Sequence, residues 1–361
     1  MFETATKTVW VLGAGQLGRM MQHAAMPLAI DVRPIDLNAK QAVSPSADDV
    51  VTAEIEAWPE NPATESLYTH PNFVNREVFG RLADRLTQKQ LIDELDIATS
   101  PWMNITEQTS KAQVIETLGE QCLLKQRRGG YDGRGQLWLN KPHEAQEYTQ
   151  FQGRAIAEQV IPFDEEVSLV GARDREGLMV FYPLTLNLHV DSILTASISP
   201  LARLQPLQAQ AETMLGKLMT ALDYVGVMAM ECFRIGDRLL VNELAPRVHN
   251  SGHWTQRGAN ASQFEQHIRA VAGLPLADIE VPGTNVMINL VGTERSMDWY
   301  QVPGAAPYWY GKSVRDGRKV GHINFTHQDQ TALVHSFQKL LKFLPKRYTT
   351  VMEWVINEIQ S

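Results

Sequence analysis

The sequence predicts an α/β protein of two or three domains. Near its N-terminus an apolar strand, a glycine-rich loop and a helix-like segment follow one another, which is typical of a βαβ unit. Farther along, two apolar strands flank the tight turn Gly236-Asp237, which predicts an antiparallel hairpin. The length of 361 residues exceeds what one hydrophobic core usually organises, so we expect more than one domain.

The composition limits the classes of protein to which this chain can belong. With 44% hydrophobic and 20% charged residues, the chain has the balance of a soluble globular protein. A formal net charge of -8 argues against a general nucleic-acid binder, because affinity for the phosphate backbone comes from clustered Lys and Arg. The two cysteines, Cys122 and Cys232, cannot form a disulfide framework, and no apolar run of about 18 residues predicts a membrane segment. We therefore expect a cytoplasmic protein without a nucleic-acid or membrane partner.

The N-terminal unit is predicted to contain strands at 8–12, 30–36 and 49–52 and a helix-like segment that ends at 28. Its G-x-G-x-x-G loop, 13–18, lets backbone amides approach an anion at a helix N-terminus. Asp36 lies near the position of the ribose-binding acid of a dinucleotide fold, so a nicotinamide cofactor is one interpretation, and a phosphate site or a structural turn is the other. Glu54 and Glu56 close the third strand, either as ligand contacts or as solvated charges.

The middle of the chain contains a second glycine-rich segment. A helical period over 81–95 and a strand at 123–125 precede it. Residues 127–136 then interleave glycines with cations, a composition that can wrap phosphates with amide and guanidinium groups. The Walker spacing is absent, and a flexible surface hairpin is the alternative.

The remaining elements are predicted from period and turn composition. They are strands at 155–161, 167–172, 178–186 and 286–291, helices at 206–222 and 262–272, a basic turn at 311–322 and a final helix.

The hairpin carries two glutamates, Glu231 and Glu243, that we expect to face each other. Like charges opposed on neighbouring strands are destabilising unless a cation lies between them, and two carboxylates suit Mg2+, which takes further ligands from nucleotide phosphates. The alternative is a hairpin with one glutamate turned to solvent. The segment that follows, 245–253, favours the metal site because it brings Arg247, His249, Asn250 and His253 beside the pair.

Together these segments resemble the ATP-grasp superfamily and, within it, the N5-carboxyaminoimidazole ribonucleotide synthetase family of de novo purine biosynthesis. The resemblance covers nearly the whole chain, and its most specific segments are 15–20, 83–89, 129–135, 226–233, 242–253 and 317–322. It implies an α/β (α+β) protein with a Rossmann-like domain (1–90), an ATP-grasp domain (91–275) of antiparallel sheets with a lid at about 120–190, and a small C-terminal domain (276–361). The family carboxylates the exocyclic amine of 5-aminoimidazole ribonucleotide with ATP and bicarbonate, through carboxyphosphate, and releases ADP and phosphate.

The resemblance also implies the roles of individual residues. Glu231 and Glu243 would hold Mg2+, with Mn2+ as a substitute, on the phosphates of ATP, the co-substrate. Arg247, His249 and Asn250 would seat bicarbonate. The ribonucleotide would contact Glu54, Tyr131, Asp132, Arg134, Lys312 and Arg318. The ATP site would comprise Arg85, Lys125, Gly130, Tyr131, Asp132, Gly133, Arg134, Gly135, Gln136, Glu158, Gln159, Val160, Ile161, Glu166, His189, Asn242 and Glu243.

Some features stay open at the level of sequence. Many ATP-grasp enzymes have Asn where this chain has Ala245, so the third metal ligand is undefined, with Asn242 as a substitute. The proton of the carboxylated amine goes either to His249 or to the departing phosphate. The family implies a homodimer. The rival functions are a related ATP-grasp ligase for another substrate, and a nicotinamide dehydrogenase or non-catalytic nucleotide-binding protein.

Overall fold

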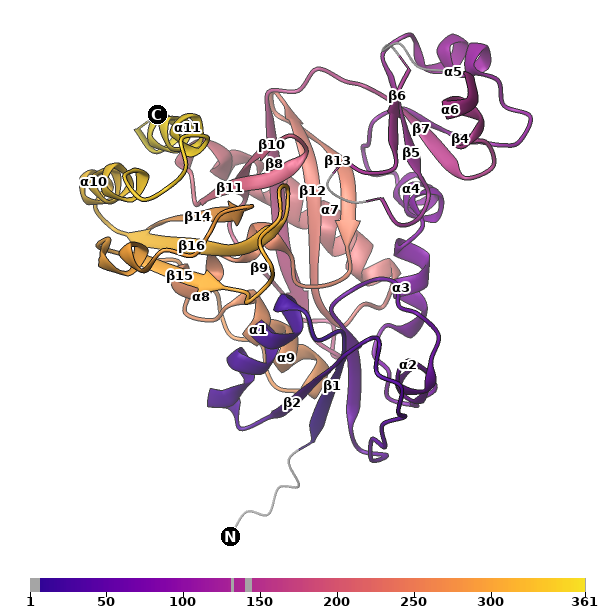
Figure 1. Ribbon diagram of the computed structural model, residues 1–361. Coiled ribbons are helices and arrows are strands. Elements are labelled where there is room, and N and C mark those ends of the chain that lie inside the picture. Colours follow the sequence, from indigo (N-terminus) through magenta and orange to yellow (C-terminus); the bar gives the residue numbers. More distant parts are fainter. Residues whose placement is uncertain (1–6, 131–132, 140–144, 361) are drawn as a thin grey trace.

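The computed structural model describes residues 7–130, 133–139 and 145–360. Figure 1 shows the N-terminal strands at the bottom, a large sheet in the middle and a small lobe projecting at the upper right. The C-terminal helices lie against the side of the large sheet away from that lobe.

The N-terminal sheet is parallel, in the order β2-β1-β3. Its strands follow the predicted ranges closely: β1 (Thr8–Leu12), β2 (Asp31–Ile35) and β3 (Val50–Ala53). Every residue of β1 is buried, because this strand pairs on both sides and is covered on its faces. Helices α1 (Gln16–Ala25), α2 (Pro62–Tyr68) and α3 (Arg76–Leu82) belong to the same region.

The small lobe, which we call the lid, has an antiparallel sheet in the order β4-β7-β5-β6. Its elements are β4 (Trp102–Ile105), α5 (Lys111–Leu118), β5 (Cys122–Gln126), β6 (Gln136–Trp138), α6 (Ala145–Thr149) and β7 (Ala155–Gln159). Helix α4 (Arg85–Glu94) leads into it. The lid expected at about 120–190 overlaps this lobe only in part, because residues beyond 165 pair within the central sheet.

The central sheet has the order β13-β12-β8-β10-β11-β14-β16-β15, with β9 paired to β8. It therefore runs without a break from the predicted hairpin into the C-terminal region. Its strands are β8 (Glu165–Arg173), β9 (Met179–Phe181), β10 (Thr185–Val190), β11 (Ile193–Ser199), β12 (Gly226–Ile235), β13 (Arg238–Ala245), β14 (Thr284–Val291), β15 (Ala305–Trp309) and β16 (Lys319–His327).

Helices cover both faces of this sheet. Apolar residues of α7 (Gln208–Ala221), α10 (Gln330–Leu341) and α11 (Tyr348–Gln360) form one core with its strands. On the opposite face α9 (Gln263–Ala272) packs between the sheet and α1, so the N-terminal unit shares a second core with the sheet. The short helix α8 (Thr255–Gly258) packs on β14 and β16. The edge of the sheet at β13 is left facing the lid (Figure 1).

Two predicted elements are each divided in the structure. The helix predicted over 81–95 breaks at Ala83–Asp84, where Asp84 leaves the helical conformation and its carboxylate accepts from Leu86 N, which caps α4. The strand predicted over 178–186 is divided between β9 and β10 near Pro183, which has no N–H to give to a ladder.

Among the described residues, no helix is both long enough and apolar enough to cross a membrane.

Candidate active site

The carboxylate pair has the predicted arrangement. Glu231 on β12 pairs with Glu243 on β13, and both side chains are partly exposed on the face toward the lid. The opposition depends on a bulge between Glu231 and Cys232, because the turn-proximal register, Ile235 with Arg238, would otherwise place Glu231 opposite Asn242.

Electrostatics favour a cation at this pair. Burial raises the pKa of Glu231, and the charges of Glu243 and Glu166 raise it further against the opposing effect of His189. Within the described ranges, no cluster of three or more His, Cys, Asp or Glu residues suited to a metal occurs. A cation here would therefore take only two protein carboxylates and would depend on other oxygen ligands, which is the behaviour of Mg2+ beside phosphates.

Arg85, the first residue of α4, connects the lid to the carboxylate pair. Its guanidinium donates to Gln126 O (2.9 Å) and Gly130 O (2.7 Å) and lies 3.3 Å from Glu243 Oε1. The same helix is fixed to the central sheet by Gln88, whose amide bonds both the N–H and the C=O of Leu244. The guanidinium of Arg85 is therefore held beside the carboxylate pair.

Lys125 on β5 is held in a buried ion-pair cluster. It contacts Glu158 on β7 and donates to Asn242 Oδ1 (3.1 Å), while Lys89 of α4 lies 2.5 Å from the other oxygen of Glu158. Burial raises the pKa of Glu158, but the two lysines outweigh it and hold the pKa at about 2. The oxygen of Asn242, the suggested substitute for the absent Asn at position 245, accepts from Lys125 in this structure.

The segment 158–161 was expected to contact adenine through its backbone. Two of its donors are already used, because Gln159 N bonds Pro101 O and Val160 N bonds Gln121 O, each within 3 Å. The side chain of Glu158 has the separate role of holding Lys125. Beyond this segment Phe163 stacks on Phe233 at 4.6 Å, and Phe163 remains 44% exposed.

Glu166 and His189 form a close pair on neighbouring strands. Glu166 Oε2 lies 2.5 Å from His189 Nδ1. Burial lowers the pKa of His189, but the hydrogen bond to Glu166 and the charge of Glu231 outweigh it, so that the pKa is raised. Glu166 and His189 thus border the carboxylate pair.

The glycine-rich loop of the lid reaches across to the central sheet. A side chain at Gly133, which has a φ of +75°, would come within 2.8 Å of Ser192, in the turn between β10 and β11. Gly130 and Gly135 lie in the same loop, and Gln136 begins β6. Arg134 has partners of its own, and Tyr131 and Asp132 lie outside the described residues.

The acceptor loop, which we define as residues 247–253, lies over the face of the central sheet. Arg247 Nε is 2.8 Å from Glu56 Oε1 of the N-terminal unit. His249 Nδ1 is 2.9 Å from Ser251 Oγ, and its Nε2 is 3.6 Å from Glu231 Oε1. Asn250 Oδ1 accepts from Asn289 on β14 at 2.5 Å. Of the three residues predicted to seat bicarbonate, His249 therefore borders the carboxylate pair, and Arg247 and Asn250 lie in the same loop.

The N-terminal glycine loop binds a carboxylate of the protein itself. Glu54 Oε1 accepts from Gly15 N and its Oε2 from Gly18 N, both at 2.5 Å. The start of α1 is thus already occupied where a dinucleotide fold would hold a pyrophosphate. Asp36 accepts from Asn38 N within its own turn. The local geometry therefore favours the structural interpretation of the glycine loop over the nicotinamide interpretation.

The basic turn of the C-terminal region meets this loop. Lys312 Nζ lies 2.5 Å from Gln16 Oε1, although the two residues are far apart in the sequence. Arg318 is held by Ser313, to which it donates at 2.6 Å. Burial lowers the pKa of Lys312, and Arg318, Lys319 and Arg19 lower it further against Glu54. Three further cations, Arg318, Lys319 and Arg19, therefore lie near Lys312 together with Glu54, and of the four the sequence predicted only Lys312 and Arg318 as ribonucleotide contacts.

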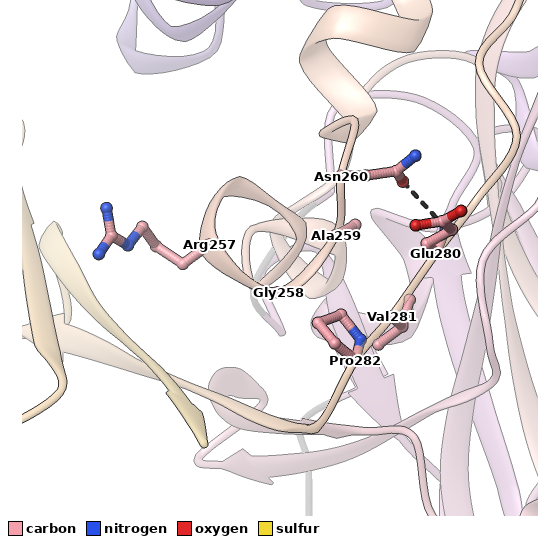
Figure 2. A pocket seen from close by; sticks show the side chains of 7 residues that line it. All are labelled: Arg257, Gly258, Ala259, Asn260, Glu280, Val281 and Pro282. Carbon is pink, nitrogen blue, oxygen red and sulfur yellow. Dashed lines mark hydrogen bonds between the residues drawn. The ribbon is translucent and has the colours of Figure 1, made fainter. Parts of the chain in front are cut away.

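A separate surface pocket of about 420 Å3 lies by α8. Figure 2 shows it between Arg257 to Asn260 and the facing segment Glu280 to Pro282. None of the predicted site residues lines it, so it belongs to another part of the surface.

Several residues around the site were missed by sequence reasoning. Lys89, Gln88, Asn289, Gln263 and Arg19 look like ordinary helix or strand residues in the sequence, because their partners lie far along the chain. Arg19, Gln88 and Lys89 fall in segments that carry the resemblance, 15–20 and 83–89, whereas Asn289 and Gln263 do not.

Family models match three segments of the chain. The ATP-grasp domain matches residues 90–264, the ribonucleotide synthetase preATP-grasp domain residues 6–75, and the phosphoribosylaminoimidazole carboxylase C-terminal domain residues 285–336. The order of the three matches is that of the N-terminal sheet, the lid with most of the central sheet, and the C-terminal strands.

Relatives match over nearly the full length. The chain is 49% identical over 359 residues to N5-carboxyaminoimidazole ribonucleotide synthase of Haemophilus influenzae, covering 99% of each chain. It is 52% identical over 349 residues to the protein of that name from Escherichia coli, covering 96% of this chain and 98% of the other.

Solved structures agree with this. The N5-carboxyaminoimidazole ribonucleotide synthetase of Thermus thermophilus superposes with a TM-score of 0.83 at 37% identity, over 94% of this chain and 99% of the other. The Aspergillus clavatus enzyme, solved with ADP and 5-aminoimidazole ribonucleotide, superposes with a TM-score of 0.81 at 25% identity, over 93% and 98%. The chain belongs to the N5-carboxyaminoimidazole ribonucleotide synthase family of ATP-grasp ligases.

Proposed function

We propose that this protein carboxylates the exocyclic amine of 5-aminoimidazole ribonucleotide with ATP and bicarbonate, and that it releases ADP and phosphate. The observation that carries the proposal is that cations near the lid and the acceptor loop both lie close to the carboxylate pair. Arg85 and Lys125 approach Glu231 and Glu243 from the lid, and the acceptor loop approaches them from the central sheet.

The nucleotide side would bind ATP between the lid and the central sheet. Arg85 and Lys125 neutralise phosphate charge, Glu166 binds the ribose hydroxyls, and the segment 159–161 with the Phe163–Phe233 pair lies beside the base. Glu231 and Glu243 fit a divalent cation, which when bound neutralises phosphate oxygens. We propose Mg2+ for it, and Mn2+ as a substitute.

The acceptor loop would hold bicarbonate next to the terminal phosphate. Arg247 supplies positive charge and Asn250 an amide, while His249 borders Glu231. Attack of a bicarbonate oxygen on the γ-phosphorus breaks the bond to ADP and forms carboxyphosphate, a mixed anhydride that water would hydrolyse. A lid loop that reaches the turn at Ser192 would exclude that water.

The ribonucleotide would lie between the N-terminal loop and the basic turn. Lys312 and Arg318 fit its 5′-phosphate, and Glu54 fits a hydroxyl or amine of the ribonucleotide. We assign Tyr131, Asp132 and Arg134 to the same substrate through the family resemblance. The amine attacks the carbonyl carbon delivered by carboxyphosphate, phosphate departs, and the nitrogen loses a proton.

Three finer features also belong to the proposal. They are a homodimeric state, a cytoplasmic location, and boundaries near 90 and 275 between the N-terminal, ATP-grasp and C-terminal domains. The matched family segments, 6–75, 90–264 and 285–336, support boundaries in those intervals.

The test is ADP formation with Mg2+, ATP, bicarbonate and 5-aminoimidazole ribonucleotide, compared with the omission of each component. We expect full turnover only with all four, and carbon-labelled bicarbonate should appear in an acid-labile product of the expected mass. ADP formation that needs a different amine or carboxylate acceptor would instead identify a related ATP-grasp ligase.

A further inference from the structure

A chain of buried hydrogen bonds runs through the central sheet to His249. It comprises Ser197 on β11, Asn187 on β10, Ser168 on β8 and Ser251 in the acceptor loop. None of these four is more than 5% exposed. Burying hydroxyl and amide groups costs free energy unless each is hydrogen-bonded, and a fully bonded network restricts its members to one arrangement. We call these four residues the relay.

The bonds of the relay run in one direction. Ser197 Oγ donates to Asn187 Oδ1 (2.8 Å), Asn187 Nδ2 donates to Ser168 Oγ (2.9 Å), and Ser168 Oγ donates to Ser251 Oγ (2.8 Å). Ser251 Oγ thus accepts from the sheet, which leaves its own hydrogen for His249 Nδ1 at 2.9 Å. Ser168 also pairs directly with Glu231 in the antiparallel strand register, so the relay passes beside Glu231 on the same face of the sheet.

A longer hydrogen bond from the backbone favours the same state of the ring. Ser251 N donates to His249 Nδ1 at 3.3 Å, so this nitrogen accepts from both groups of Ser251. A neutral imidazole accepts at one nitrogen and carries its hydrogen on the other. The hydrogen of His249 is therefore on Nε2, the nitrogen that lies 3.6 Å from Glu231 Oε1.

The main chain at His249 is fixed as well. The amide of Gln263, which is fully buried at the start of α9, bonds His249 N (2.9 Å) and His249 O (2.6 Å). Backbone and ring are thus held by separate sets of hydrogen bonds, one from α9 and one from the sheet.

We propose that Ser197, Asn187, Ser168 and Ser251 are positioning residues that fix His249 in the tautomer with its hydrogen on Nε2, so that the ring presents a hydrogen-bond donor to the acceptor site. The proposal rests on the proposed function only for the partner of that donor, which is an oxygen of bicarbonate or carboxyphosphate. Because the nitrogen that faces the site already carries a hydrogen, neutral His249 presents no free lone pair there to take the proton of the amine.

The tautomer can be measured without any substrate. In protein labelled with 15N in its histidine rings, long-range 1H–15N spectra distinguish a nitrogen that carries hydrogen from one that does not, and the spectrum of His249→Gln identifies the His249 resonances. We expect a hydrogen-bearing Nε2 and an accepting Nδ1. A hydrogen on Nδ1 in the wild type would overturn the proposal.

Ser168→Ala interrupts the relay, and Ser199→Ala is its matched control. Ser199 is equally buried on β11 and donates to the carbonyls of Pro183 and Leu184, outside the relay. We expect Ser168→Ala to shift the His249 ring resonances toward an average of both tautomers and to lower kcat about tenfold, the loss that corresponds to one hydrogen bond of about 1.4 kcal/mol. KM for ATP should stay within about twofold, and Ser199→Ala should change neither the spectrum nor kcat.

Ser197→Ala, at the far end of the relay, provides a second interruption if Ser168→Ala does not fold. Equal losses in a relay variant and in Ser199→Ala would overturn the proposal, because they would indicate a general effect of destabilising the sheet. Absence of ribonucleotide-dependent ADP formation in the wild type would overturn the proposed function alone, since the ring spectrum would still report the tautomer.

Discussion

The nucleotide side and the acceptor side of this site are built from different interactions. Around Lys125 the protein uses full charges: Glu158 is buried between two lysines, and Arg85 meets Glu243. Around the ring of His249 it uses neutral groups, which are the relay, Gln263 and the Asn250–Asn289 pair, while charge enters the acceptor loop through the Arg247–Glu56 ion pair. Phosphates are multiply charged and need counter-charge, whereas a small planar anion needs donors at fixed angles.

The difference also appears in the titrating groups. Lysines hold the pKa of Glu158 at about 2, so it stays charged, whereas burial lowers the pKa of His253 to about 3, so it stays neutral. At neutral pH, therefore, one buried group on the nucleotide side is ionised and one buried group on the acceptor side is neutral.

The largest expected effect comes from the carboxylate pair, where the two regions meet. Glu231→Gln should lower turnover by at least about a thousandfold, since it removes one of two protein ligands to the cation. The variant should melt at the same temperature as the wild type or higher, because the pKa of Glu231 is raised in the fold and its charge therefore destabilises the protein at neutral pH. Thermal unfolding and ADP formation are measured against Glu265→Gln, a surface ion-pair variant on α9. Turnover at the wild-type rate would refute the metal assignment.

The nucleotide side should be sensitive to the loss of one charge. Glu158→Gln leaves Lys89 buried without its counter-ion, so we expect a loss of about 3 kcal/mol in the free energy of unfolding at pH 7. This difference from wild type should persist down to about pH 4.5 and diminish as the pH falls further toward 2, because the depressed pKa of Glu158 contributes stability only above that window. Denaturant unfolding gives both values. The control is Glu165→Gln, which breaks ion pairs with Arg203 and Arg234 away from Lys125; an equal loss there would mean that the buried cluster has no special importance.

The sequence predicted the parts of this site that depend on short-range order. Glu231 and Glu243 lie on strands joined by a two-residue turn, so their proximity follows from the turn. Their direct opposition needed in addition a bulge next to Cys232, which the sequence did not indicate. The expectation that the two glutamates face each other was therefore confirmed, although the turn alone does not explain it.

Long-range contacts were not predictable in the same way. Glu54 caps the glycine loop from another strand, and the side chain of Glu158 holds Lys125 although only its backbone had been given a role. The relay joins residues that are up to 83 positions apart. A single serine or asparagine in a strand forms no repeating pattern from which its partner could be predicted. The relay residues become neighbours only through the pairing of the strands.

On the acceptor side, Arg247→Ala should separate binding of ATP from use of bicarbonate. The guanidinium lies beside Glu56 and donates to the carbonyl of Val248, both outside the nucleotide side, so ATP and ADP affinities measured by calorimetry should stay nearly unchanged. Bicarbonate-dependent phosphate release should fall about a hundredfold, the usual effect of removing one preorganised donor to an anion. If the variant instead lost ATP affinity and kept its bicarbonate response, Arg247 would belong to the nucleotide side.

The basic turn provides a smaller effect that should be confined to the ribonucleotide. Lys312→Ala removes one charge-assisted contact, worth roughly 1.5–3 kcal/mol, so KM for the ribonucleotide should rise by about one to two orders of magnitude. KM for ATP should not change. Arg315→Ala, an exposed cation of the same turn, is the control. An equal rise of both KM values in Lys312→Ala would contradict the assignment to the 5′-phosphate.

The smallest effect tests whether the acceptor side must stay neutral. His253 is fully buried against the rings of Phe264 and His322, and burial lowers its pKa to about 3, against about 6.5 in an unfolded chain. Between these values the unfolded state binds the proton and the folded state does not, so acidification through this window favours unfolding. One such histidine should lower the free energy of unfolding by about 1 kcal/mol between pH 7 and 5.5.

His253→Gln should therefore lose less stability than wild type over that interval. Glu158→Gln should lose as much as wild type, since Glu158 contributes a pH dependence only below about pH 4.5. Denaturant unfolding at several pH values measures these slopes; parallel slopes for His253→Gln and wild type would show that the neutral state of His253 adds no pH dependence to folding.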